Sequence, residues 1–200
     1  EIYDVELDFF QFTKLQKTLR QGNWAVTVAI FNDHTNTPPR IVEIWPGLYE
    51  EGLYGLAIDL GSTTIAAHLT DLKSGEVLKS AGLMNPQIRF GEDLMSRVSY
   101  SMMNSGGDKE MTIVVREAIN SLAEQLRKET GIEKNSLVEV VFVCNPVMHH
   151  LLLGIDPVEL GQAPFALASS NSITVNASHL DLSNMNPSGR CYILPCIAGH

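Results

Sequence analysis

The amino-acid sequence predicts a mixed α/β protein preceded by part of a small α+β domain. Three observations lead to this prediction. Residues 54–83 contain apolar or alternating runs separated by short turns, which is typical of a three-stranded meander. Two segments with apolar residues at helical spacing follow the meander. The first 50 residues differ in composition and hold both tryptophans, which indicates a separate unit.

The first unit is predicted to be a helix followed by a β-hairpin. A short helix is expected near residues 9–20, where lysine and arginine mark a polar face. Two apolar runs come next, Ala25–Phe31 and Ile41–Trp45. Turn-forming residues fill the interval 32–39, so the two runs are expected to be the strands of a hairpin with a long loop.

The boundary between the two units is predicted just after this hairpin. Pro46-Gly47 breaks the strand pattern, and we therefore assign residues 1–50 to the small domain and 51–200 to the larger one. A chain of 200 residues is long enough for one domain with a smaller one attached. Its first residue is Glu1 rather than Met, so we expect a piece of a longer protein.

The larger unit is expected to open with the meander. Gly55–Leu60 is an almost continuous apolar run that ends in an acid, and such a run predicts a strand buried on both faces. Ile65, Ala67 and Leu69 alternate with smaller or polar residues, which predicts a second strand with one buried face. A third strand is expected near residues 76–83.

Two helices and a further strand are predicted after the meander. One helix is expected over 91–103, with Glu92 and Asp93 in its first turn, where carboxylates favour the helix dipole. A longer helix is expected over 109–130, with Gly131 at its carboxyl end. The resulting order is β-β-β-α-α-β-α. The remaining expectations are a strand at Val138–Cys144, a helix at Val147–Leu153, a loop or insertion over 160–190 and a strand at Tyr192–Leu194.

Charge and cysteine content exclude several classes of protein. The chain has 14 Lys and Arg against 23 Asp and Glu, a formal charge of −9, which disfavours nucleic acids and anionic membranes as partners. Its 3 cysteines are too few for a disulfide scaffold and fit a reducing compartment, so we expect a cytoplasmic protein. No apolar run approaches the roughly 18 residues that a membrane span needs.

The segment from Asp59 to Thr64 carries the clearest functional signal. Asp59 stands at the end of the first predicted strand, and Gly61 can adopt a positive φ and let a ligand approach the backbone. Ser62, Thr63 and Thr64 offer hydroxyl groups and a run of amides that can bind an anion. An acid beside such a cradle suits a hydrated divalent cation. The same residues also suit an ordinary hairpin, and both readings stay open on the motif alone.

Several longer motifs resemble a known family. The stretch from Gly55 to Leu72 resembles the first phosphate motif of the actin, sugar-kinase and heat-shock chaperone superfamily. Four ordered motifs are similar to a narrower family, the ATP-dependent reductive activators of corrinoid proteins. They are Asn85–Asp93 with Ser96–Val98, Cys144–Pro157, Leu160–Phe165 and Leu194–Gly199.

This resemblance implies a ribonuclease-H-like fold, namely the first lobe of an actin-like ATPase domain with the start of the second lobe over residues 51–200. It implies ATP and Mg²⁺ as cofactors, with Asp59 as the magnesium-associated catalytic carboxylate and residues 61–64 as the phosphate cradle. Glu92 is a second candidate catalytic residue, and Asn145 is expected to help bind the cofactor or to cap the next helix.

The resemblance also implies a function and a partner. Family members reduce cob(II)alamin to cob(I)alamin in a corrinoid protein that serves methyl transfer. An iron–sulfur cluster is expected only in a domain outside this chain. By itself, the 200-residue chain is expected to bind ATP weakly, to hydrolyse little or none of it and so to be inactive. A homodimer is a further expectation. The alternatives are a kinase or phosphatase of the same superfamily and a non-catalytic module for partner binding or dimerisation.

Other polar residues receive structural predictions. His149 and His150 are adjacent on a predicted helix and point about 100° apart, so a structural role is favoured over joint metal binding. Arg97 is interpreted as a solvated surface residue, although a contact to phosphate is the alternative. Cys191 and Cys196 are expected to be free thiols in the core.

Overall fold

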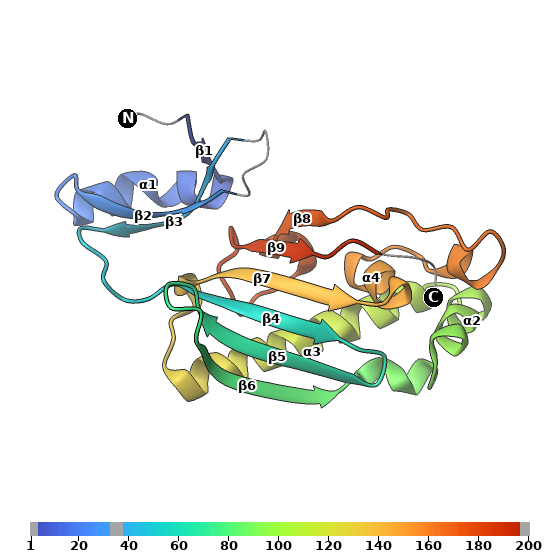
Figure 1. Cartoon of the computed structure of the whole chain (residues 1–200). Coiled ribbons are helices and arrows are strands. Elements are labelled where there is room, and N and C mark those ends of the chain that lie inside the picture. Colours follow the sequence, from blue (N-terminus) through green and yellow to red (C-terminus); the bar gives the residue numbers. More distant parts are fainter. Residues whose placement is uncertain (1–3, 33–37, 197–200) are drawn as a thin grey trace.

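The computed structural model describes residues 4–32 and 38–196, and it contains two β-sheets. The small sheet belongs to the first unit and has the strand order β1-β3-β2 (Figure 1). Strand β3 lies in its centre, parallel to β1 and antiparallel to β2. Its elements are β1 (Glu6–Leu7), α1 (Phe9–Gln21), β2 (Val26–Phe31) and β3 (Arg40–Pro46).

The larger sheet has six strands in the order β6-β5-β4-β7-β9-β8. The pairs β4–β7 and β7–β9 are parallel, and the other pairs are antiparallel, so the sheet is mixed as expected. Its elements are β4 (Tyr54–Leu60), β5 (Thr64–Asp71), β6 (Val77–Met84), α2 (Leu94–Met103), α3 (Gly107–Thr130), β7 (Leu137–Cys144), α4 (Pro146–Leu153), β8 (Ile173–Asn176) and β9 (Arg190–Ile193).

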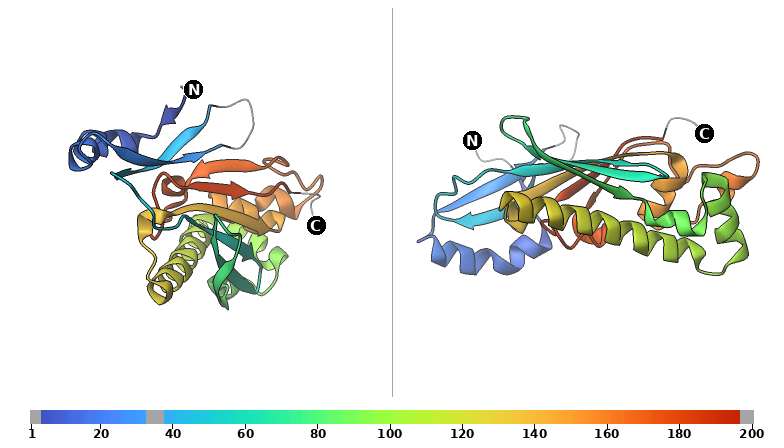
Figure 2. Two further views of the ribbon diagram at one scale, coloured as in Figure 1. Left: turned by 60° about the vertical axis from the view of Figure 1, so that its left-hand side comes forward. Right: turned by 90° about the horizontal axis from the view of Figure 1, so that it is seen from below.

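Helix α3 covers one face of the larger sheet (Figure 2, right). Its apolar stripe is buried, as the helical spacing predicts, and Gly131 ends the helix in the left-handed conformation at φ 73°. The core lies between this stripe and the inward side chains of the strands, including Ile58, Leu69 and Phe142. None of the helices in the described part of the chain is long and apolar enough to cross a membrane.

The opposite face of the larger sheet is partly open, which corrects the expectation for the first strand. Ala57 and Asp59 of β4 are exposed, whereas Ile58 and Leu60 are fully buried. The strand therefore buries one face rather than two. The run looked continuous because alanine and glycine are small enough for either environment and hide the period-two pattern.

The element order β-β-β-α-α-β-α is confirmed over residues 54–153, with small shifts of bounds. Glu92 and Asp93 precede α2 instead of lying in its first turn. Asp93 is the N-cap, and its Oδ1 accepts a hydrogen bond from the amide of Ser96 at 2.7 Å. The segment predicted as a loop over 160–190 contains strand β8, and strand β1 was not expected. Residues 33–37 of the predicted hairpin loop lie outside the described residues.

Buried polar contacts join the two units. Asp8 at the start of α1 accepts hydrogen bonds from Asn176 Nδ2 and Ser188 Oγ of the larger unit, each at 2.7 Å. Glu43 of β3 accepts one from Asn186 Nδ2 at 2.8 Å. Asp8 and Glu43 are only 9% and 1% exposed. The hydrogen bonds that these carboxylates would make to water are therefore replaced by hydrogen bonds from the larger unit.

Candidate functional site

The turn between β4 and β5 has its carbonyl groups held on the inner side. The Gly61 carbonyl accepts a hydrogen bond from Asn85 Nδ2, and the Thr63 carbonyl accepts one from the Asn85 amide, both at 2.8 Å. The Ser62 carbonyl accepts one from the Arg97 guanidinium. Asn85 and Arg97 are fully buried, so three successive carbonyl groups point into the protein.

This arrangement directs the amides of the turn outward. In a trans peptide, the carbonyl of one residue and the N–H of the next point in opposite directions. The N–H groups of Ser62 and Thr63 therefore point away from the bracketing side chains, and neither makes a hydrogen bond within residues 4–32 and 38–196. Exposed successive amides of this kind form an anion-binding concavity, to which the side-chain hydroxyls add donors.

Gly61 is required for close packing rather than for unusual backbone dihedrals. Its φ is not positive, which corrects the expected conformation. Its amide donates to the Thr64 carbonyl at 3.1 Å, and a Cβ at this position would lie 2.7 Å from that same oxygen. Any side chain would therefore push the two ends of the turn apart.

Asp59 lies on the open face of the sheet next to the turn. It is in register with Ala66 of β5 and Val143 of β7. Because side chains two residues apart share a face, Thr64 lies on the same side as Ala66 and Asp59. The carboxylate is exposed at the edge of a hollow of about 240 Å³ that His68 also lines. An exposed carboxylate beside amide and hydroxyl donors suits a hydrated magnesium ion bound to an anion.

The other two predicted site residues have different environments. Asn145 follows β7, whose Cys144 is in register with Leu60, so it stands one strand away from the turn. Its Oδ1 accepts a hydrogen bond from the amide of Met148 at 3.0 Å, and it therefore caps α4. Glu92 is exposed, and no hydrogen bond or ion pair joins it to the residues that the structure describes.

Arg97 is the residue whose environment the sequence interpretation missed. It is fully buried rather than solvated, and burial lowers the pKa of its guanidinium, while the charge of Asp93 acts in the opposite direction. Asn85 and Gln87 are buried beside it. The only sequence signal for these three residues was the family motif that contains them.

The histidines and cysteines of the described residues form no metal site. His150 fits a neutral tautomer, because Nδ1 lies 2.8 Å from the Pro146 carbonyl and Nε2 accepts the Ala168 amide. Burial lowers the pKa of both His149 and His150. No group of three His, Cys, Asp or Glu in the described ranges could hold a metal ion. The free thiols of Cys191 and Cys196 are buried, as predicted.

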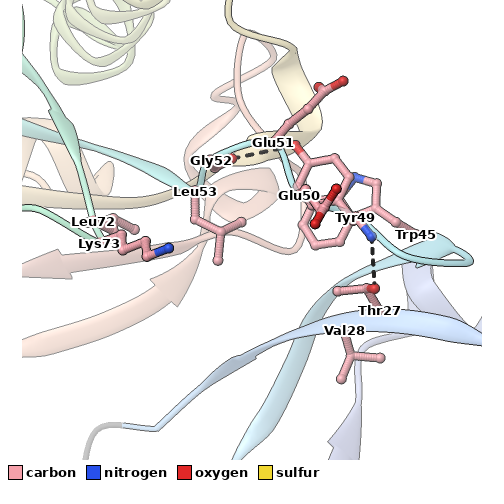
Figure 3. Close-up of a pocket in the computed structure, with 10 residues that line it drawn as sticks. All are labelled: Thr27, Val28, Trp45, Tyr49, Glu50, Glu51, Gly52, Leu53, Leu72 and Lys73. Carbon is pink, nitrogen blue, oxygen red and sulfur yellow. Dashed lines mark hydrogen bonds between the residues drawn. The ribbon is translucent and has the colours of Figure 1, made fainter.

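A larger hollow of about 580 Å³ lies at the junction of the two units, away from the turn (Figure 3). Trp45 and Tyr49 stack against each other in its wall, with ring centroids 4.0 Å apart. The Thr27 hydroxyl accepts the Tyr49 amide at 3.0 Å and fixes the connector between the units. None of the predicted site residues lines this hollow. Its stacked rings and the Thr27–Tyr49 hydrogen bond hold together the connector between the two units.

Comparison with known proteins gives matches over nearly the whole chain. Residues 54–200 match the family model described as the RACo middle region, and residues 1–51 match the RACo linker region. The chain is 29% identical over 161 residues to the corrinoid activation enzyme RamQ of Eubacterium limosum, which covers 80% of this chain and 27% of that protein.

A solved structure is similar over almost the same extent. The reductive activator for corrinoid, iron–sulfur protein superposes with a TM-score of 0.86 and 35% sequence identity. The match covers 98% of this chain and 31% of the other one. The chain therefore spans less than a third of the length of these two relatives.

Proposed function

The chain belongs to the RACo family, and from that premise we propose that it takes part in the ATP-dependent reductive activation of a corrinoid protein. The proposed reaction is the one-electron reduction of cob(II)alamin to cob(I)alamin in a partner that serves methyl transfer. The electron would come from an iron–sulfur cluster outside this chain. A cytoplasmic location and a homodimer remain predictions.

The observation that carries the proposal is the turn at residues 61–64. Its inward carbonyls and outward amides offer donors to an anion. This supports a nucleotide site at the edge of a mixed sheet. We accordingly propose that residues 51–200 form the first, ribonuclease-H-like lobe of an actin-like ATPase domain and the start of the second, and that 1–50 end a smaller domain.

The residues present fit ATP and Mg²⁺. The amides of Ser62 and Thr63 and the hydroxyl of Thr64 would hold phosphate oxygens, and the exposed carboxylate of Asp59 would hold water molecules of the magnesium shell. When bound, Mg·ATP supplies the free energy of nucleotide binding and hydrolysis. We also propose Glu92 and Asn145 as contacts of the bound nucleotide. Asn145 has less freedom to make such a contact, because its side chain already caps helix α4.

The mechanism requires that the nucleotide favour one conformation of the longer protein. A ligand shifts an equilibrium only by its difference in affinity for the two states. In this chain, the turn and Asp59 bind and orient the phosphates on one side, and a second lobe would complete the site. We propose that the closed state is the one that binds the corrinoid partner and admits the electron.

Replacement of Asp59 tests this proposal. Asp59→Asn should weaken binding of Mg·ATP to this chain by about tenfold, which corresponds to the loss of one charge-assisted contact. Binding is followed by amide NMR titration, which detects weak affinity. Glu76→Gln, in the turn between β5 and β6 at the opposite end of β5 from the site, removes the same charge and should leave binding unchanged.

The outcomes separate the proposed functions. Equal Mg·ATP affinity in a folded Asp59→Asn protein would remove the magnesium role and favour the partner-binding module. Phosphoryl transfer from ATP to a small molecule would favour the kinase or phosphatase. In the longer protein, ATP-stimulated loss of the cob(II)alamin signal in electron paramagnetic resonance spectra is the result expected for a corrinoid activator.

A further inference from the structure

Three buried side chains, two from the segment between β6 and α2 and one from α2 itself, hold the candidate site in shape. We call Asn85, Gln87 and Arg97 the carbonyl bracket. Asn85 and Arg97 bind the carbonyls of the turn, as described above. Gln87 Oε1 accepts a hydrogen bond from Arg97 Nη1 at 3.3 Å, and Gln87 Nε2 donates to the Met111 carbonyl of α3 at 3.0 Å. The bracket thus fixes the turn to the long helix beneath the sheet.

Arg97 is unusual within the bracket because its charge has no direct ion pair in the described part of the chain, and the charge of Asp93 acts on it without a salt bridge. Its partners are the carbonyls of Ser62 and Gly91, the Gln87 side chain and the Met148 sulfur, all of which are neutral. Within the described ranges, no carboxylate lies at ion-pair distance from it. A fully buried cation without a direct ion pair is costly, so the approach of further charge of the opposite sign is favourable.

The position of Arg97 makes the outer side of the turn the place where such charge can approach. Its guanidinium contacts the inner end of the Ser62–Thr63 peptide group, whose outer end is the Thr63 N–H. Holding the carbonyl aligns this dipole, and the guanidinium adds positive potential behind it. An exposed surface arginine could contact phosphate directly but could not orient the backbone in this way.

We propose that Arg97 is a positioning residue of the polyphosphate site: it turns the Thr63 amide outward and supplies the positive charge behind the turn. This inference rests on the proposed function, because it assumes that the turn binds the phosphates of a nucleotide. The ligand chemistry that it specifies is a polyphosphate with Mg²⁺, recognised by backbone amides with a buried guanidinium behind them.

Inorganic tripolyphosphate with Mg²⁺ is the probe that tests this inference, because it lacks the adenosine group. Amide NMR shifts of Ser62 and Thr63 are followed during titration of the whole 200-residue chain. Arg97→Met keeps the volume of the side chain and removes its charge and donors. We expect about a tenfold loss of affinity. The ligand-induced shift of the Thr63 amide should disappear, whereas that of Ser62 should persist, because Asn85 still holds the Gly61 carbonyl.

Arg116→Met is the matched control. Arg116 Nε also donates to a backbone carbonyl, that of Leu152, at 3.0 Å, but it lies on α3 and is not part of the bracket. Its replacement should change neither affinity nor the two amide shifts. Should Arg97→Met fail to fold, Arg97→Gln removes the charge while keeping hydrogen-bonding groups, and it should show the same loss.

The possible results distinguish this inference from the proposed function. If the unaltered chain binds tripolyphosphate and the folded Arg97 variants bind it equally well with the Thr63 shift intact, the role of Arg97 is wrong and the site stands. If the unaltered chain shows no shift of either amide with tripolyphosphate or Mg·ATP, the nucleotide site itself is wrong. A selective loss at Thr63 supports both.

Discussion

Replacing Asp8 with alanine should weaken the connection between the two units of the chain. Asp8 Oδ1 caps helix α1 through the amide of Phe10 at 3.0 Å and also accepts the Ser188 hydroxyl, while Oδ2 accepts the Asn176 amide group. Loss of a helix cap costs about 1 kcal/mol. Each buried hydrogen bond to a charged group contributes about 1.5–3 kcal/mol. The low ends of these ranges give a loss of about 4 kcal/mol from the free energy of unfolding.

Because both tryptophans lie in the small unit, their fluorescence reports the unfolding of that unit separately from the larger one. Trp24 and Trp45 both lie in the small unit, whereas the longest helix, α3, lies in the larger one. In urea, Asp8→Ala should lower the unfolding midpoint seen by tryptophan fluorescence more than the midpoint seen by circular dichroism at helix wavelengths. Coincident transitions in the unaltered chain would provide the two-state reference.

Asp71→Ala is the control for this experiment. Asp71 also accepts two backbone amides, those of Lys73 and Ser74, but it ends β5 at an exposed turn, and its side-chain hydrogen bonds in the described ranges stay within the larger unit. Its loss should cost no more than about 1 kcal/mol. The reasoning is refuted if Asp8→Ala shifts both midpoints equally or leaves the fluorescence midpoint where it was.

Two further predictions concern the turn and the thiols. Gly61→Ala should destabilise the chain by about 1–3 kcal/mol, because its Cβ would meet the Thr64 carbonyl; urea unfolding measures this, and an unchanged midpoint would contradict it. Burial raises the pKa of the Cys144 and Cys191 thiols to about 12, so iodoacetamide should modify them far more slowly in the native chain than in urea at pH 8.5. Since the unfolded thiols ionise above about pH 8.5 while the native ones stay protonated, stability should fall as the pH rises from there toward 12, and a flat profile would argue against the raised pKa values.

The elements that the sequence predicted are those with strong local patterns. Helix α3 carries an apolar stripe over many turns, and the strands from Tyr54 to Met84 are separated by short turns that form from neighbouring residues. Strand β1 has only two residues and exists because Glu6 and Leu7 pair with Arg40 and Ile41, more than thirty positions away. No local pattern encodes such a strand.

The local geometry of the candidate site could be predicted from the sequence only in part, for the same reason. Asp59 and the turn were visible because they are contiguous in the sequence. The burial of Arg97 depends on acceptors from residues 62, 87, 91 and 148, which only the folded chain brings together. Strand β8 was hidden because Ile173, Thr174 and Val175 lie within a stretch rich in Ser and Asn, whose turn-forming character dominated the interpretation.

The long sequence separation of the contacts at Asp8 has a consequence for the order in which the chain assembles during synthesis. The Gly61 carbonyl is 24 positions from Asn85 in the sequence, and the Ser62 carbonyl is 35 positions from Arg97. The turn can therefore be fixed soon after these residues leave the ribosome. The partners of Asp8, by contrast, are Asn176 and Ser188, which lie 168 and 180 positions later in the sequence. Asp8 is therefore synthesised well before Asn176 and Ser188, and the contacts that hold the turn at residues 61–64 can form before these bonds between the two units.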